Sequence, residues 1–200
     1  MLKLLGSWSQ PLTSVDVQDL QAAIERFDCK CQFCGLQTHL SPKVPLGHFD
    51  VCVRDRSLPN EPANWVPLCK MCVTLNDIRN LDKKGSFIEA PWCSQSRLTN
   101  VLRLSYAISL SPELEWGALK EASSRFLIAI DNSPKEWATV EWSGEVSGLS
   151  SILSNSPFPY ADKAYLHALR FRFDMEPFKD AIAYWTPSLE QQVRDVSEVR

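Results

Sequence analysis

Two CxxC pairs are the feature that most limits what this chain can fold into. Cys31-Gln32-Phe33-Cys34 is followed, after 34 intervening residues, by Cys69-Lys70-Met71-Cys72. Each pair brings two thiolates to one tight turn, so the two pairs together supply the four ligands of a closed tetrahedral Zn²⁺ site. The alternative is a set of free thiols that pack as small hydrophobic side chains. Two independent pairs favour zinc, and four thiolates leave no open coordination position, which predicts a structural ion.

The other three cysteines are expected to lie outside this site. The total of seven is odd, and the first residues hold too short an apolar run for a secretion signal, which argues against a disulfide framework. Cys29 lies two residues before Cys31 and could replace it, although the CxxC spacing favours Cys31 and Cys34. Cys52 and Cys93 are expected to pack in the interior.

Hydrophobic periodicity predicts an α+β chain with a boundary near residue 92. Residues 1–92 would form the zinc-binding module, and residues 93–200 a mainly helical region packed on it. In the first part we expect a helix capped by Ser14, with the elements at 2–8 (strand), 15–27 (helix), 44–53 (hairpin or bulged strand pair), 71–81 (helix) and 86–90 (strand). In the second part we expect helices at 98–108, 111–130, from 133, at 147–155, 161–171 and 176–186.

The charge balance argues against a nucleic-acid partner. The chain has 21 basic and 24 acidic residues, a net charge of −3, and residues 101–200 hold 10 basic and 14 acidic side chains. Affinity for nucleic acid comes from neutralising many phosphates, so neither half reads as a binding module for DNA or RNA. The acidic second half would favour a basic partner segment. No apolar run approaches the ~20 residues of a spanning helix, so no direct membrane insertion is expected.

The residues between and around the cysteine pairs resemble a zinc-stapled HNH (ββα-metal) module. The resemblance rests on CxxC, an apolar strand ending at His48, and the run from Asn64 through Leu68-Cys69 and Cys72 into a helix. In that family the histidine activates a water molecule, and the asparagine steadies the loop that orients it. The resemblance therefore implies roles for His48 and Asn64 in a nuclease.

The same resemblance implies that the catalytic metal site is degenerate. The family holds a second, catalytic metal through an Asp or His just before the histidine and a His or Asn just after the last cysteine. Here these positions are Gly47 and Val73, which cannot bind a metal. Metal-assisted cleavage would then have no electrophile. Only displaced ligands at Asn76 or Asp77, one helical turn beyond Val73, could complete the catalytic metal site. His48 is therefore expected to be a hydrogen-bonded remnant of that site.

A second resemblance covers nearly the whole chain, to the IcmJ/DotN family of type IVB (Dot/Icm) secretion and related conjugation systems. It is carried by Leu2-Lys3-Leu4 with Gly6-Ser7-Trp8, Cys31-Gln32-Phe33-Cys34-Gly35, the second cysteine pair, Gly85-Ser86-Phe87-Ile88 to Pro91, Glu145-x-x-Gly148 and Phe178-Lys179-Asp180-Ala181-Ile182-x-x-Trp185. Residues 40–64 and 112–140 match poorly. This chain departs from the family in keeping His48 and a longer segment between the cysteine pairs.

The second resemblance implies a non-enzymatic, zinc-containing adaptor. Its partners would be the C-terminal tail of the coupling ATPase and other subunits of the coupling complex. The protein would be cytoplasmic and recruited to the inner membrane through that complex. The alternative is an HNH-type DNA endonuclease that uses His48, Asn64 and displaced metal ligands such as Asn76.

Overall fold

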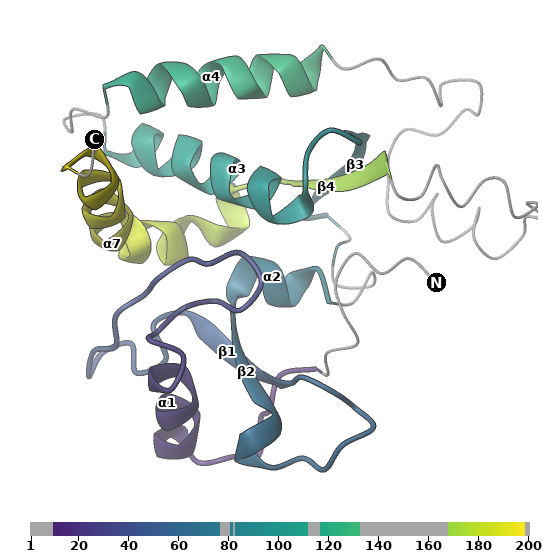
Figure 1. Cartoon of the computed structure of the whole chain (residues 1–200), viewed down its shortest axis with the longest axis vertical. Helices are drawn as coiled ribbons and strands as arrows, with labels where there is room; N and C mark the ends of the chain where they lie inside the picture. The colour runs from purple at the N-terminus through teal and green to yellow at the C-terminus, as the bar shows by residue number, and fades with distance from the viewer. Residues whose placement is uncertain (1–9, 77–80, 82, 112–116, 133–167, 199–200) are drawn as a thin grey trace, which may run out of the picture. The chain divides into compact units, whose positions relative to one another are not determined.

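The computed structural model describes residues 10–76, 81, 83–111, 117–132 and 168–198, which form parts of two compact units (Figure 1). One unit combines Leu5–Asp77 with Phe178–Arg200 and is called the cysteine unit below. The other combines Met1–Leu4 with Ile78–Pro177 and is called the insert unit. Each unit is therefore discontinuous in the sequence, whereas the sequence analysis divided the chain once, at residue 92.

An antiparallel hairpin followed by a short helix lies at the centre of the cysteine unit. Strand β1 (Phe49–Val53) pairs with β2 (Trp65–Cys69), with Phe49 opposite Cys69 and Val53 opposite Trp65. Helix α2 (Lys70–Thr74) begins directly after β2. All five residues of β2 are buried, which explains why this strand shows no alternating pattern in the sequence. The hairpin thus extends to Cys69, well beyond the range 44–53 predicted for it. Its loop includes the 3₁₀ turn Pro62–Asn64.

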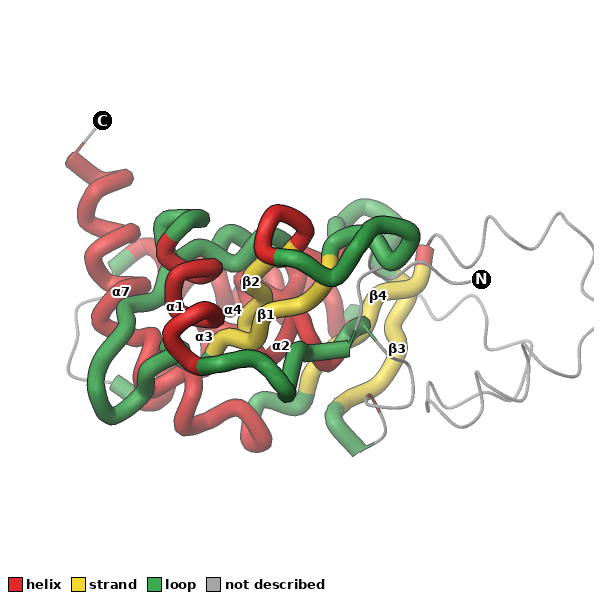
Figure 2. The backbone as a smooth tube through the Cα atoms, turned by 90° about the horizontal axis from the view of Figure 1, so that it is seen from below, coloured by secondary structure: helices red, strands yellow, loops and turns green. Residues whose placement is uncertain are grey.

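Helix α1 (Val17–Glu25) packs beside the hairpin, as Figure 2 shows from below. Its N-cap is Asp16, whose carboxylate accepts a hydrogen bond from the Gln18 backbone N–H at 2.7 Å, so the helix begins later than a Ser14 cap would give. The largest fully buried side chains of this unit come from α1, the turn after it, the hairpin, α2 and the C-terminal helix: Ile24, Leu36, Phe49, Leu68, Met71 and Trp185.

The insert unit has its own two-stranded antiparallel sheet. Strand β3 (Gly85–Glu89) pairs with β4 (Leu169–Phe173), and helix α3 (Gln95–Leu110) packs on β4 and on α4 (Ala118–Asp131). The buried Gln95 side chain donates to the Phe171 carbonyl at 2.9 Å and accepts from the Phe171 N–H at 2.7 Å. Gln95 therefore satisfies both backbone groups of one residue in β4 and fastens α3 to it.

The C-terminal helix α7 (Lys179–Glu198) belongs to the cysteine unit, although about 100 residues of the other unit precede it. It follows the 3₁₀ turn η5 (Glu176–Phe178) and contains most of the helix predicted at 176–186, but it continues twelve residues beyond the predicted end. Its residues Ala181, Ile182, Trp185 and Leu189 are buried and recur at helical spacing.

Several sequence-based predictions need correction or fall outside the description. The helix predicted at 161–171 is wrong at its end, because Leu169–Phe173 is a strand in which buried residues alternate with partly exposed arginines. Helix α2 ends at Thr74, earlier than the predicted residue 81. The helix predicted at 15–27 and the strand predicted at 86–90 correspond closely to α1 and β3. The predictions at 2–8 and 147–155, and the helix from residue 133, lie outside the described residues.

Candidate metal centre

The structure brings Cys31, Cys34, Cys69 and Cys72 together in one buried group. The four Sγ atoms all lie within 4.8 Å of one another, and those of Cys34 and Cys69 are 3.8 Å apart. A tetrahedral ion with metal–sulfur bonds of about 2.3 Å holds its ligand sulfurs about 3.8 Å from one another. A disulfide would need a sulfur–sulfur distance of about 2 Å, and all seven cysteines are free thiols. The four residues could therefore hold one metal ion.

The first cysteine pair lies on a tight turn directly after α1. The Gly35 N–H donates to the Cys31 carbonyl at 2.9 Å, and the Cys31 N–H donates to the Leu36 carbonyl at 2.8 Å. Gly35 has φ = +73°, a conformation that glycine adopts without strain, so the residue after the CxxC closes the turn. The Gln32 N–H donates to the Pro67 carbonyl at 3.0 Å and fastens this turn to β2.

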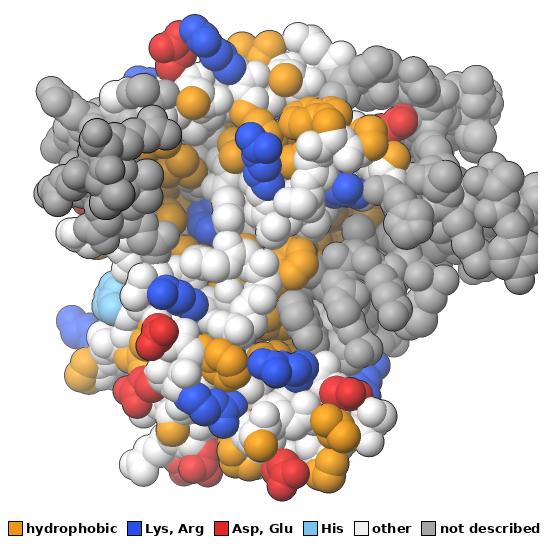
Figure 3. Space-filling model, viewed as in Figure 1, with side chains coloured by type: hydrophobic (Ala, Val, Ile, Leu, Met, Phe, Trp, Pro, Cys, Tyr) orange, Lys and Arg blue, Asp and Glu red, His pale blue; other side chains and the backbone are white. Residues whose placement is uncertain are grey.

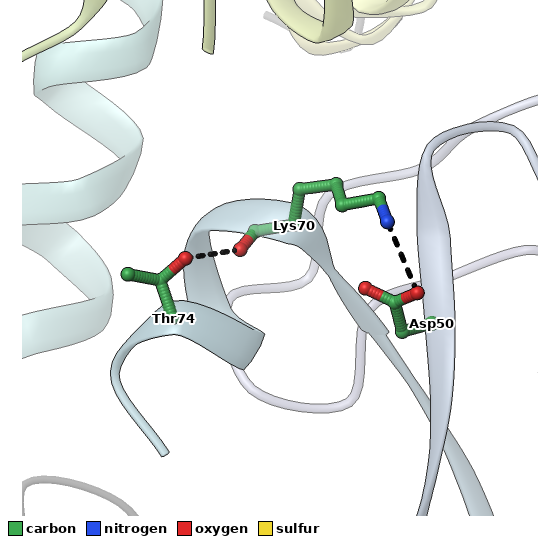
Figure 4. Close-up of polar contacts among 3 residues, drawn as sticks. All are labelled: Asp50, Lys70 and Thr74. Carbon is green, nitrogen blue, oxygen red and sulfur yellow. Dashed lines mark hydrogen bonds and ion pairs between the residues drawn. The ribbon is translucent and has the colours of Figure 1, made fainter. Parts of the chain in front are cut away.

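The second pair lies where β2 becomes α2. Cys69 is the last residue of β2 and Cys72 lies in the first turn of α2, so the change from strand to helix folds both sulfurs toward the same point. Beside it, the Lys70 ammonium contacts the Asp50 carboxylate at 3.1 Å, and the Thr74 hydroxyl donates to the Lys70 carbonyl at 2.9 Å (Figure 4). The Lys70–Asp50 contact joins the start of α2 to β1, whereas the Thr74 bond lies within α2.

Burial makes Cys69 and Cys72 poor acids in the absence of a cation. Burial raises the pKa of Cys69 and Cys72 well above the ordinary value for a thiol. Burial also opposes ionisation of Cys31, but hydrogen bonds from the Cys69 and Cys72 thiols lower its pKa below the ordinary value. A divalent cation would supply the positive charge that four buried thiolates require.

The remaining three cysteines lie outside the four-sulfur group. Cys52 is completely buried in β1, and burial raises its pKa to about 12, which makes it an inert packing residue. Cys93 is also buried, and its thiol donates to the Ser94 carbonyl at 3.3 Å. Cys29 is half-buried, and the group that could hold a metal contains Cys31 in its place.

His48 directly precedes β1 and is only partly buried, with its ring beside two aromatic side chains of α7. Its ring centroid is 5.1 Å from that of Tyr184 and 6.2 Å from that of Trp185, both in edge-on geometry. Its backbone carbonyl accepts a hydrogen bond from the Lys70 N–H at 3.2 Å. Burial, and then the nearby Lys70 ammonium, lower the pKa of His48. The expected remnant histidine is therefore held largely by aromatic packing.

Gly47 has no room for a side chain. A Cβ at this position would lie 2.5 Å from the His39 carbonyl oxygen and 2.6 Å from the Thr38 hydroxyl, and its φ of +57° is strained for other residues. Its carbonyl accepts hydrogen bonds from the Thr38 hydroxyl at 2.9 Å and from the Trp185 indole at 2.8 Å. The packing therefore excludes the metal-binding Asp or His of the HNH pattern at this position.

The other described nuclease positions lie on α2, directly after α2 and in the loop between β1 and β2. Val73 is buried on α2, and Asn76 follows the end of that helix, with its N–H bonded to the Val73 carbonyl at 3.0 Å. Asp77, the second displaced ligand considered, lies outside the described residues. His48 and Asn64 lie just beyond opposite ends of the hairpin, whose paired residues Phe49 and Val53 are separated by four steps of about 3.4 Å, or about 14 Å.

Asn64 stabilises the loop that joins β1 to β2. Its side-chain carbonyl accepts from the Asp55 N–H at 3.1 Å, and its amide donates to the Asp55 and Pro59 carbonyls at 2.8 and 3.1 Å. These bonds use the side chain within the loop, and the residue is buried. The resemblance implied a loop-steadying asparagine, and the loop that Asn64 steadies is remote from His48.

Sequence reasoning did not predict that Tyr184 and Trp185 of α7 contact the His48 ring. Tyr184 stacks on His39, with 4.3 Å between ring centroids and 19° between planes, and its hydroxyl donates to the His39 carbonyl at 2.9 Å. Trp185 was noted only as part of a matching C-terminal segment. No local signal places it against a residue more than 130 positions earlier, although a tryptophan on the apolar stripe of a helix indicates a packing anchor.

Fold and site together define a mixed helix-and-sheet chain with a buried four-cysteine cluster that could bind a metal. No protein-family model matches the chain, and no curated protein matches it significantly. Within the part of the chain that the structure describes, no helix is both long and apolar enough to cross a bilayer.

Proposed function

We propose that the four-cysteine cluster holds a structural Zn²⁺ ion and that the chain is a non-enzymatic adaptor. The observation that carries the metal assignment is the burial of four thiols whose sulfurs all lie within 4.8 Å of one another. A set of four soft sulfur ligands in tetrahedral spacing suits zinc and excludes the oxygen-preferring ions Mg²⁺ and Ca²⁺. With all four positions taken by protein, the ion stabilises the fold and leaves no place for a substrate.

The proposed setting is the coupling complex of a type IVB secretion or conjugation system, as the resemblance to the IcmJ/DotN family implies. The adaptor would bind the C-terminal tail of the coupling ATPase and neighbouring subunits from the cytoplasmic side of the inner membrane. The hairpin β1–β2 with α2 would be an HNH-like module that serves as scaffold. The acidic balance of residues 101–200 supports a basic segment as the partner.

The surroundings of His48 support a role without catalysis. A general base must reach its water and a metal-bound phosphate, whereas the His48 ring packs against Tyr184 and Trp185. The neighbouring metal-ligand positions are a glycine with no space for a side chain and a buried valine. On the face drawn in Figure 3, basic and acidic side chains intermingle over the cysteine unit, so that face has no continuous basic track for DNA.

Metal analysis and partner capture on one purified sample test this proposal. We expect one zinc per chain in the wild type, loss of zinc in Cys34→Ser, and retention in the matched control Cys29→Ser. The zinc-loaded chain should capture the coupling ATPase tail, and capture should weaken as salt concentration rises, because the proposed contact pairs opposite charges. Zinc-loaded protein that does not bind the tail would contradict the adaptor assignment.

A nuclease assay on the same protein tests the alternative. We expect no nicking of supercoiled plasmid with Mg²⁺ or Mn²⁺ above the level of a His48→Ala variant. Cleavage by the wild type that disappears in His48→Ala would overturn the non-enzymatic assignment and favour the HNH endonuclease.

A further inference from the structure

Residues 37–48, called the seat loop below, receive the C-terminal helix α7. Tyr184 stacks on His39 and donates its hydroxyl to the His39 carbonyl at 2.9 Å. Trp185 is fully buried and donates its indole N–H to the Gly47 carbonyl at 2.8 Å. Two adjacent aromatic residues, each with a hydrogen bond to the loop backbone, therefore anchor α7 to the cysteine unit.

The first cysteine pair is connected to this seat through Thr38. Directly beside the pair, Lys30 bridges to Gln37, and the Thr38 N–H donates to the Cys29 carbonyl at 2.9 Å. The Thr38 hydroxyl donates to the Gly47 carbonyl at 2.9 Å, the same oxygen that accepts the Trp185 indole. Thr38 is only 4% exposed, so a movement of the first cysteine turn is transmitted to the Trp185 acceptor through one tightly packed residue.

The second cysteine pair reaches the seat by a separate route. Phe49 lies opposite Cys69 in the hairpin, and its ring packs edge-on against Trp185 with 6.3 Å between centroids. The Lys70 N–H, directly after Cys69, bonds to the carbonyl of His48, whose ring also contacts Trp185. Both turns that position the metal ligands therefore support the same tryptophan.

We propose that metal binding at the four cysteines and docking of α7 are energetically coupled, so that loss of the metal releases α7 from the seat loop. This inference rests on the proposed metal centre and adds a conformational consequence to it. Without an ion the four sulfurs lose their common partner, and the two turns that hold the seat can relax. Release would expose Trp185, which is fully buried and bonded to the seat loop in the docked state.

Hydrogen–deuterium exchange of the full chain, with and without a zinc chelator, tests the coupling. We expect backbone exchange in residues 179–191 to rise at least about tenfold on zinc removal, while α3 of the insert unit keeps its protection. Unchanged protection of α7 in zinc-free protein would overturn the proposal. Equal loss of protection in α3 and α7 would also overturn it, because zinc would then support only the fold as a whole.

Reciprocity supplies a second test, because a coupling free energy acts equally in both directions. Trp185→Phe removes the hydrogen bond to Gly47 and should weaken zinc affinity, measured by equilibrium competition with a chelator, by about fivefold, the factor that one hydrogen bond contributes. The matched control is Trp92→Phe, at a half-exposed position of the insert unit, where zinc affinity should match the wild type. Equal zinc affinities for Trp185→Phe and the wild type would overturn the coupling.

The metal content of each sample separates failure of this proposal from failure of the metal centre. Protein that never retains zinc contradicts the proposed centre and, with it, the coupling. If the protein retains one zinc per chain but hydrogen exchange in α7 does not change when the zinc is removed, only the coupling is contradicted.

Discussion

Substitution of Gly47 by alanine is the sharpest test of whether the packing around this position excludes a side chain. The glycine has φ = +57°, and an added Cβ would lie 2.5 Å from the His39 carbonyl oxygen. Gly35 is the matched control, since its φ is +73° but no atom lies within 4 Å of its added Cβ. The two substitutions therefore share a backbone cost and differ in steric overlap.

The expected magnitudes follow from these two contributions. A side chain in the left-handed region costs about 1–2 kcal/mol, which is the whole cost expected for Gly35→Ala. Overpacking adds about 1–3 kcal/mol at Gly47, because the Thr38–His39 backbone must move away from the Cβ. Gly47→Ala should therefore lower the free energy of unfolding by about 2–5 kcal/mol.

Urea unfolding of the zinc-loaded variants, followed by tryptophan fluorescence, measures the difference. Gly47→Ala should be the less stable variant by about 1–3 kcal/mol, and Gly47→Asp, which restores a carboxylate at the HNH ligand position, should be no more stable than Gly47→Ala. Equal destabilisation at Gly47 and Gly35 would show that the seat loop moves freely. The steric argument against a catalytic metal ligand would then fail.

Three further perturbations have expected outcomes. Cys34→Ser should lower the free energy of unfolding by several kcal/mol in the presence of zinc, whereas Cys29→Ser should not; equal melting temperatures of the two would contradict the four-cysteine assignment. Because burial and then Lys70 lower the pKa of His48, its stabilising contribution is complete above about pH 6.5 and is lost as pH falls through the lowered folded-state pKa. The unfolding free energy of the wild type should thus fall more steeply from pH 7 to 5 than that of His48→Asn, and parallel profiles would refute this. Lys70→Met should change stability by less than about 1 kcal/mol in urea unfolding, since the ammonium that contacts Asp50 belongs to a half-exposed side chain; a larger loss would contradict the weak ion pair.

Elements with a local signal could be predicted, and α1 and β3 agree with their predictions to within about two residues. Strand β4 also carried a local signal, because Leu169-Arg170-Phe171-Arg172-Phe173 alternates with period two. The helix predicted at 161–171 overlaps this strand and is wrong there. Strand β2 had no such signal, since Trp65–Cys69 is buried on both faces and contains a proline.

The metal centre and its surroundings show the same division between local and distant information. Each CxxC turn places two sulfurs by local geometry, so spacing alone pointed to Cys31, Cys34, Cys69 and Cys72. The aromatic surroundings of His48 depend on Trp185, whose indole bonds to Gly47, 138 positions earlier in the chain. Hydrophobic periodicity does not reveal a contact between residues so far apart in the sequence.

The distant contact decides how the HNH-like residues should be interpreted. From sequence, His48 is expected to be a hydrogen-bonded remnant, with Gly47 and Val73 at the positions where the resemblance implies metal ligands. In the structure, the Gly47 carbonyl is an acceptor for both Thr38 and Trp185, so a metal ligand at position 47 would displace the loop that seats α7. A side chain at position 47 and the docking of α7 therefore compete for the same loop.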